Sequence, residues 1–215
     1  MTRVAIIGAG DLGQQIAHYI RQSNNHQVVG FYDDFAQIGE QRNGTPVLGT
    51  INELMAKSQE VLFDELLLGI GYKHIKFRRS LFEQLQPVRS FATFIHPTCT
   101  IDPDASIEAG SVLFPCVHLD RNAKIKKNVV VNIGVTVSHD SEIDSHCFVS
   151  PRVAIAGFSY IGKRCILGIN STVIDNINIC EDVQIGGGTV VTRNINKPGL
   201  YVGAPARLIR DFQYE

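Results

Sequence analysis

The chain has 215 residues, of which 44% are hydrophobic and 19% are charged, and its formal net charge is −1. This balance, without blocks of like charge, a bilayer-length apolar run or a signal peptide, predicts a cytoplasmic protein that binds neither nucleic acid nor a membrane. The five cysteines form no CxxC pair, which disfavours a zinc site, and their odd number disfavours a disulfide framework.

Residues 1–90 have the pattern of a small α/β domain. Strands are predicted over 3–7, 28–32 and 65–70, and helices over 14–21 and 73–86. Residues 8–13, Gly-Ala-Gly-Asp-Leu-Gly, match the GxGxxG pattern between the first strand and the first helix. Such a turn brings backbone N–H groups and the positive end of the helix toward a phosphate. The pattern therefore predicts a Rossmann-like βαβαβ half-domain that binds a nucleotide.

The glycine turn has two other interpretations. An NAD site with Asp33 on the ribose is disfavoured, because residues 1–90 provide only half of a dinucleotide fold and no dehydrogenase domain follows. The glycines could instead serve only to pack the helix closely against the strand. We expect a nucleotide diphosphate here, and no NAD.

From Ile95 onward the sequence repeats every six residues. Every sixth residue from Ile95 to Val191 is Ile, Leu or Val, and a small or β-branched residue follows four positions after each one from Ile101 onward. A period of six fits no α-helix and is typical of a parallel β-helix, in which each hexapeptide forms one short strand and one corner. Three hexapeptides complete a turn of 18 residues. We expect the aliphatic residue to point inward and the small residue to occupy the tight corner.

The repeat predicts an all-β domain over residues 91–215, including a C-terminal tail, and it relates two residues of chemical interest. His139 and Gly157 each follow a repeat aliphatic residue by two positions, and 18 residues separate them. They should therefore stack on consecutive turns, at the outer surface. A histidine base and a backbone N–H donor would then face one reacting centre.

Taken in order, several segments resemble the bacterial nucleotide-sugar acetyltransferases, the group of bacillosamine-pathway N-acetyltransferases and sialic acid O-acetyltransferases. The matching segments are IIGAGDLG, GFYDD, GIG, FIHP, VNIGVTVSHD, SPRVAIAG, IGGGTVV and YVGAPARLI. The resemblance implies a left-handed coil and an enzyme that moves an acetyl group from acetyl-CoA to a nucleotide-linked sugar in surface glycan biosynthesis. It also implies a homotrimer with acetyl-CoA between subunits, and no metal.

The resemblance assigns roles to individual residues. His139 would be the general base, Asp140 would orient its imidazole, and the backbone N–H of Gly157 would stabilise the thioester oxyanion. The other implied contacts are with the nucleotide sugar (Gly8, Gly10, Asp11, Asp33, Gly71 and Asn132) and with acetyl-CoA (Ala156, Gly157, Ile169, Gly187 and Arg207).

The acceptor and the chemistry leave alternatives open. An N-acetyltransferase acting on a 4-amino-sugar is favoured, and an O-acetyltransferase using the same His139 is the nearest rival. A non-catalytic nucleotide-binding β-helix would need no base, and a metal-binding β-helix of the carbonic anhydrase kind would need histidines gathered at one interface. Many members of the family have a histidine where this chain has Leu12, which leaves the identity of the nucleotide open.

Overall fold

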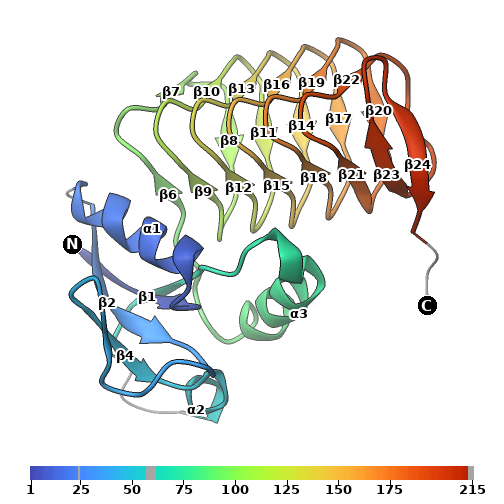
Figure 1. Cartoon of the computed structure of the whole chain (residues 1–215). Coiled ribbons are helices and arrows are strands. Elements are labelled where there is room, and N and C mark those ends of the chain that lie inside the picture. The colour runs from blue at the N-terminus through green and yellow to red at the C-terminus, as the bar shows by residue number, and fades with distance from the viewer. Residues whose placement is uncertain (24, 57–61, 213–215) are drawn as a thin grey trace. The chain divides into compact units, whose positions relative to one another are not determined.

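The computed structural model describes residues 1–23, 25–56 and 62–212 (Figure 1). The chain divides into two compact units, Met1–Phe94 and Ile95–Glu215. Within the described ranges, no helix is long and apolar enough to cross a membrane.

The N-terminal unit is built on one sheet with the strand order β3-β4-β2-β1-β5. Strands β1, β2, β4 and β5 are parallel, and β3 pairs with β4 in the antiparallel sense. The bounds are β1 (Thr2–Ile7), α1 (Asp11–Arg21), β2 (His26–Tyr32), β3 (Gln41–Arg42), β4 (Thr45–Gly49), α2 (Ile51–Ala56), β5 (Glu65–Leu68), the 3₁₀ turn η1 (Tyr72–His74) and α3 (Ile75–Leu85).

The three predicted strands and both predicted helices are present in this unit. The hairpin of β3 and β4 has no counterpart in the sequence prediction, because Pro46 and the flanking Gly44 and Gly49 interrupt any apolar alternation. The last predicted helix begins with the separate 3₁₀ turn η1 before it continues as α3.

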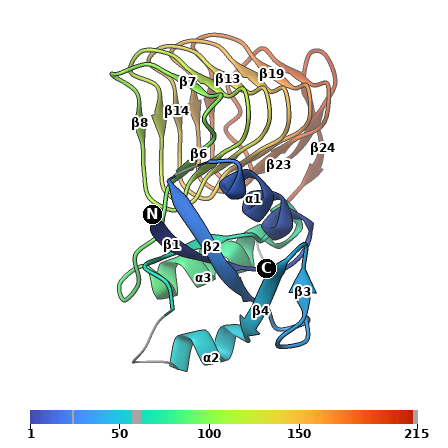
Figure 2. The same ribbon diagram turned by 90° about the vertical axis from the view of Figure 1, so that its left-hand side faces the viewer.

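The second unit forms the predicted left-handed parallel β-helix, whose strands gather into three sheets (Figures 1 and 2). Residues 18 apart face each other in every parallel pair of two-residue strands, as in Thr136 beside Ala154 and Val137 beside Ile155. Strand β24 runs antiparallel to β23 and ends the largest sheet. In Figure 2, β7, β13 and β19 follow one side of the coil, and β8 and β14 follow another.

The strands of the first sheet are β7 (Thr100–Ile101), β10 (His118–Leu119), β13 (Thr136–Val137), β16 (Ala154–Ile155), β19 (Thr172–Val173) and β22 (Val190–Val191). Those of the second are β8 (Ser106–Ile107), β11 (Lys124–Ile125), β14 (Glu142–Ile143), β17 (Tyr160–Ile161) and β20 (Asn178–Ile179). Those of the third are β6 (Phe94–Ile95), β9 (Val112–Leu113), β12 (Val130–Val131), β15 (Phe148–Val149), β18 (Ile166–Leu167), β21 (Val183–Ile185), β23 (Gly199–Val202) and β24 (Arg207–Asp211).

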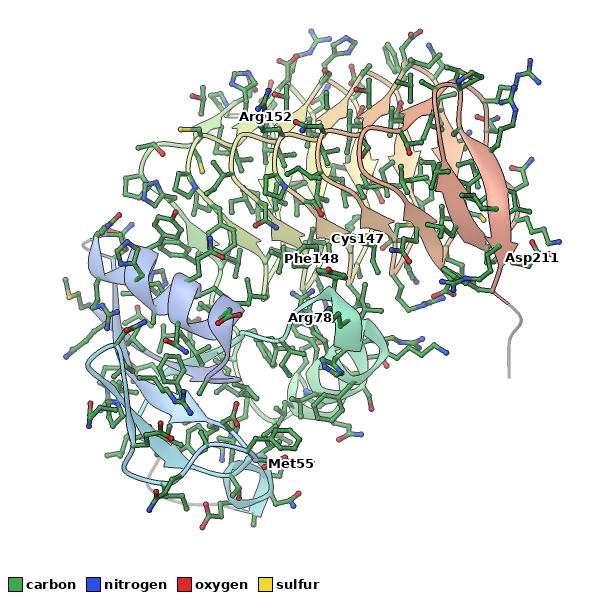
Figure 3. All side chains as sticks on the ribbon, viewed as in Figure 1. Met55, Arg78, Cys147, Phe148, Arg152 and Asp211 are labelled. Atoms are coloured by element: carbon green, nitrogen blue, oxygen red, sulfur yellow. The ribbon has the colours of Figure 1, made fainter. Side chains whose placement is uncertain are left out.

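The repeat aliphatic residues from Leu113 to Val191 are buried and form the core of the coil, as predicted. The tight corner, however, does not lie at the small residue. The left-handed backbone conformation recurs every sixth residue from Gly110 to Gly188, three positions after each aliphatic residue. Asn, Asp and Gly hold most of these corners because they tolerate a positive φ. Arg152, an exposed corner residue, points out of the coil in Figure 3.

The small residues that follow each corner point inward instead, and this corrects the sequence prediction. From Ser111 onward they are buried, and the hydroxyl or thiol groups of five of them, Ser111, Ser141, Cys147, Ser159 and Cys165, donate to backbone carbonyls of the next turn. Ser141 Oγ donates to the Ala156 carbonyl at 2.9 Å and Cys147 Sγ to the Gly162 carbonyl at 3.1 Å. A small side chain is needed here because the interior beside the corner is narrow, and the hydrogen bond satisfies a buried carbonyl.

Candidate active site

His139 lies at the corner that follows β13, two residues after the buried Val137. Its Nδ1 is 3.0 Å from the Oδ2 atom of Asp140, and its side chain is 42% exposed. Among the residues that the structure describes, none forms a hydrogen bond with Nε2. An imidazole held at Nδ1 and open at Nε2 is arranged to exchange a proton with a bound molecule.

Asp140 is itself fixed from the preceding turn. Its Oδ1 atom accepts a hydrogen bond from the Asn122 amide at 2.8 Å, and the guanidinium of Arg121 lies 3.8 Å from Oδ2. The hydrogen bond from Asn122, and then the one with His139, hold the pKa of the Asp140 carboxyl below its usual value. Asp140 therefore stays ionised and can act as the acceptor that orients the imidazole.

Gly157 lies one turn beyond His139, and the imidazole lies over it. A methyl group placed on Gly157 would be 2.7 Å from Cε1 and 2.9 Å from Nε2 of His139. The Gly157 N–H takes part in none of the backbone hydrogen bonds found in the described part of the chain. The pair thus sets a proton acceptor next to an uncommitted N–H donor, the two groups that acyl transfer requires.

Two residues near His139 were not among the residues predicted from the sequence. Asn122 precedes Asp140 by one turn, and Phe158 follows it by one turn, with its ring centroid 5.0 Å from that of His139 at an interplanar angle of 84°. All three occupy left-handed corner positions. Steps of one full turn from Asp140, in both directions along the sequence, would have identified them.

Ile169 and Gly187, which the resemblance assigns to acetyl-CoA, lie at a different corner from His139, and so does Asn132, which it assigns to the acceptor sugar. Asn132, Ile169 and Gly187 belong to the corner that precedes the first sheet, whereas His139 and Gly157 belong to the corner that follows it. Ile169 is 51% exposed, and a methyl group on Gly187 would be 3.2 Å from its Cγ2, so these two stack on consecutive turns. One chain therefore keeps Ile169 and Gly187 apart from His139 and Gly157, at opposite ends of the strands of one sheet.

Three further predicted residues have simple surroundings in the coil. The amide of Asn132 is 6% exposed and donates to the Val149 carbonyl at 2.9 Å. Ala156 immediately precedes Gly157, and its N–H donates to the Val173 carbonyl at 2.9 Å. Arg207 begins β24, is exposed, and donates to the Ala206 carbonyl at 2.9 Å.

The glycines of the N-terminal turn divide into two kinds. A methyl group on Gly13 would lie 1.9 Å from the Gly8 carbonyl oxygen, and one on Gly69 would lie 2.5 Å from the Gly13 Cα. These glycines let α1 approach β1 and β5 closely. Gly10 and Gly71, in contrast, have no atom within 4 Å of such a methyl group. Both precede a helical turn and leave open space where a ligand can approach.

Asp33 ties this turn to the loop after β2. Its Oδ2 accepts from the Ala9 N–H at 2.7 Å, and its Oδ1 accepts from the N–H groups of Phe35 and Ala36 at 2.8 Å and 3.0 Å. The carboxylate is thus already bound to backbone, which makes it a support of the turn. Asp11 is exposed in the first turn of α1. Within the described ranges, no group of three acidic, histidine or cysteine residues could hold a metal ion.

Comparisons with known proteins match the two units of the chain to different extents. The model of the PglD N-terminal domain matches residues 3–85. UDP-3-O-acylglucosamine N-acyltransferase of Bordetella avium is 36% identical over 110 residues, which is 48% of this chain and 28% of that protein. The enzyme of Bordetella pertussis is 42% identical over 69 residues, 32% of this chain and 19% of that protein. The chain thus spans less than a third of the length of these curated relatives.

Solved structures match along almost the whole chain. The acetyltransferase domain of PglB from Neisseria gonorrhoeae in complex with acetyl coenzyme A is 27% identical, with a TM-score of 0.87, over 97% of this chain and 99% of that one. A histidine-to-asparagine variant of perosamine N-acetyltransferase from Caulobacter crescentus, in complex with CoA and GDP-perosamine, is 26% identical with a TM-score of 0.90, over 98% of both chains. Together with the two units and the six-residue repeat, these matches show that the chain has the same fold as these sugar N-acetyltransferases and that residues 3–85 are similar to the PglD N-terminal domain.

Proposed function

We propose that the protein transfers an acetyl group from acetyl-CoA to the amino group of a nucleotide-linked 4-amino-sugar. The observation that carries the proposal is the stacking of the half-exposed His139 imidazole over Gly157, with Nε2 and the Gly157 N–H both uncommitted. Two structural relatives support the donor and the acceptor: the PglB domain was solved with acetyl-CoA, and the perosamine enzyme with CoA and a GDP-linked sugar.

The chemistry follows from these two groups. As the sugar nitrogen attacks the thioester carbon and a C–N bond forms, Nε2 of His139 takes the proton that the nitrogen loses. Negative charge then develops on the thioester oxygen, and the Gly157 N–H donates to it; such a donor typically contributes about 3–4 kcal/mol to the transition state. The C–S bond breaks as the intermediate collapses, and His139 returns the proton to the CoA sulfur. The products are an N-acetyl sugar and free CoA.

The nucleotide end of the acceptor is assigned to the turn at Gly8, Gly10 and Asp11, with Asp33 and Gly71 near the nucleoside. The open space at Gly10 and Gly71 supports this assignment, because a phosphate could approach the backbone N–H groups there. Asn132 is assigned to the acceptor sugar. The cytoplasm is the proposed location, since acetyl-CoA and nucleotide sugars are found there, and surface glycan biosynthesis is the proposed context.

The donor site is assigned to two copies of the chain. Ala156 and Gly157 would contribute from one corner of one subunit, and Ile169, Gly187 and Arg207 from another subunit of a homotrimer. The separation of these corners within one chain supports a shared site. The exposed apolar side chain of Ile169 supports it too, since burial against a bound cosubstrate would remove that surface from water.

A thiol-release assay with acetyl-CoA tests the proposal. The acceptors are UDP-, GDP- and dTDP-linked 4-amino-6-deoxy sugars, with the matching 4-hydroxy sugars as controls, and wild type is compared with His139→Ala. We expect one amino-sugar to release CoA, and His139→Ala to lower kcat by about 100-fold or more. Turnover only with hydroxy sugars would replace N-acetylation by O-acetylation. Binding of acetyl-CoA without any turnover would contradict an acetyltransferase for these acceptors.

A further inference from the structure

Phe158 has an aromatic side chain that its own packing does not explain. The side chain is 57% exposed, and the residue has a φ of 57°, in the left-handed region. This conformation is unfavourable for a bulky side chain, and an exposed ring gains little from the hydrophobic effect. Neighbouring turns place Asp140 and Asn176 at the same corner position, and such residues tolerate that backbone well. The fold alone would therefore favour a small polar residue at 158.

The ring of Phe158 contacts one functional group, the imidazole of His139. The two ring centroids are 5.0 Å apart with an interplanar angle of 84°, the edge-to-face arrangement that aromatic pairs favour. The backbone supports this contact, because the Phe158 N–H donates to the His139 carbonyl at 3.2 Å. The position of the ring is therefore coupled to the corner that carries the base.

The imidazole needs such a contact. Its hydrogen bond to Asp140 fixes Nδ1 but leaves the ring free to rock about that bond. Because Gly157 has no side chain, the imidazole has room above it, and no side chain at this position restricts its motion. Phe158 supplies the lateral contact that Asp140 and Gly157 do not.

We propose that Phe158 is a positioning residue, whose ring holds the His139 imidazole so that Nε2 faces the reacting centre. The inference rests on the proposed function, in which Nε2 takes the proton from the acceptor. Because Phe158 acts through His139, its loss should impair the chemical step more than the binding of substrates. A displacement of a reacting group by about 1 Å can reduce the rate by about 100-fold.

Three substitutions at Phe158 distinguish the effect of the aromatic ring from the effects of the backbone conformation and of apolar character. Phe158→Leu keeps an apolar residue on the same unfavourable backbone but removes the ring, and Phe158→Asn removes the ring while suiting the left-handed corner. Phe158→Tyr keeps the ring. We expect Leu and Asn to lower kcat by about 10-fold to 100-fold with KM for acetyl-CoA changed by less than about twofold, and Tyr to retain most of the activity. Tyr160→Leu, which removes an aromatic ring from β17 two residues after Phe158, should leave kcat unchanged.

A second measurement does not depend on turnover. In the NMR spectrum of the free protein labelled at histidine, the ring current of Phe158 should shift the imidazole protons of His139. The Leu and Asn variants should lose this shift and broaden the signals, whereas the Tyr variant and Tyr160→Leu should keep them. Wild-type kcat in both the Leu and Asn variants, or a Tyr variant as impaired as Leu, would overturn the inference. If wild type releases no CoA from any acceptor, the proposed function fails, and unchanged His139 signals in Leu and Asn would then overturn the positioning role.

Discussion

At the scale of single residues, Gly157 is explained by a residue one turn away from it. Nothing in its own hexapeptide requires glycine, since its φ lies outside the left-handed region and the true corner is Phe158. The requirement comes from His139, whose imidazole occupies the space that a side chain at 157 would need. Its N–H takes part in none of the backbone hydrogen bonds of the described residues, which leaves it available for the proposed role as oxyanion donor.

Gly157→Ala tests this explanation. The added methyl group would lie 2.7 Å from Cε1 of His139, so the imidazole must move away from the reacting centre. We expect kcat to fall by about 10-fold to 100-fold, while Tm changes by only a few degrees because the half-exposed imidazole can turn outward. Steady-state kinetics and thermal unfolding check the two effects. A variant with full activity would show that the imidazole need not lie over Gly157.

At the scale of elements, the glycine turn between β1 and α1 contains glycines in two different surroundings. The packing interpretation holds for Gly8 and Gly13, which with Gly69 lie in close backbone contact, whereas Gly10 borders open space, where we propose that the phosphate approaches. The pattern GxGxxG cannot distinguish these two surroundings, because they depend on how the backbone folds: Gly13 packs against the Gly8 carbonyl, and Gly8 packs against Gly69, which follows β5 far along the chain.

Two matched substitutions separate the uses. Gly13→Ala should destabilise the N-terminal unit by about 2 kcal/mol or more, because its methyl group would lie 1.9 Å from the Gly8 carbonyl oxygen. Gly10→Ala should fold with a nearly unchanged Tm but raise KM for the nucleotide sugar, because the methyl group would fill open space next to the helix end. Thermal unfolding and kinetics of both variants check this. An unchanged KM for the nucleotide sugar in Gly10→Ala would contradict the assignment of the phosphate to this turn.

Strand β2 also carries a pH dependence. Burial lowers the pKa of His26, although the Glu65 carboxylate partly opposes this, and Nδ1 is buried without a hydrogen-bond partner among the described residues. The unfolded chain therefore binds a proton more readily than the folded one, and stability should fall as the pH drops below about 6.5. Denaturant unfolding of His26→Phe between pH 7 and pH 5 should have a smaller pH dependence than wild type. His96, whose pKa burial also lowers, leaves part of the dependence in place; an identical slope would contradict the role of His26.

At the scale of the whole molecule, the coil orders the candidate site by two independent rules. Residues one turn apart are stacked, which brings Asn122, Asp140 and Phe158 into one column at the His139 corner. Residues at opposite ends of the strands of one sheet are separated by the length of those strands. This keeps Ile169, which precedes β19, away from His139, which follows β13. The first rule brings the proposed base and its neighbours together within one chain, and the second motivates the proposal that another subunit completes the site.

Complementation tests the shared site. His139→Ala and Ile169→Glu should each be nearly inactive alone, because the first lacks the proposed base and the second places a charge where Ile169 is proposed to contact acetyl-CoA. If the site lies between copies, mixed trimers of the two variants contain wild-type sites, about a quarter of the total at random mixing. Co-expression should restore that fraction of activity, and mixing of separately folded trimers without exchange should not. No recovery in demonstrated mixed oligomers would place the site within one chain.

The sequence by itself determined the coil, because a strict six-residue repeat of buried aliphatic residues allows no other packing, and it therefore also determined that His139 and Gly157 would stack. It also indicated the strands and helices around the glycine turn. It did not reveal the β3–β4 hairpin, the true position of the corner, the hydrogen bond of Asn122 with Asp140, or the contact of Phe158 with His139. Those depend on a positive φ and on neighbours a whole turn away, and such features emerge only when the backbone is folded in three dimensions.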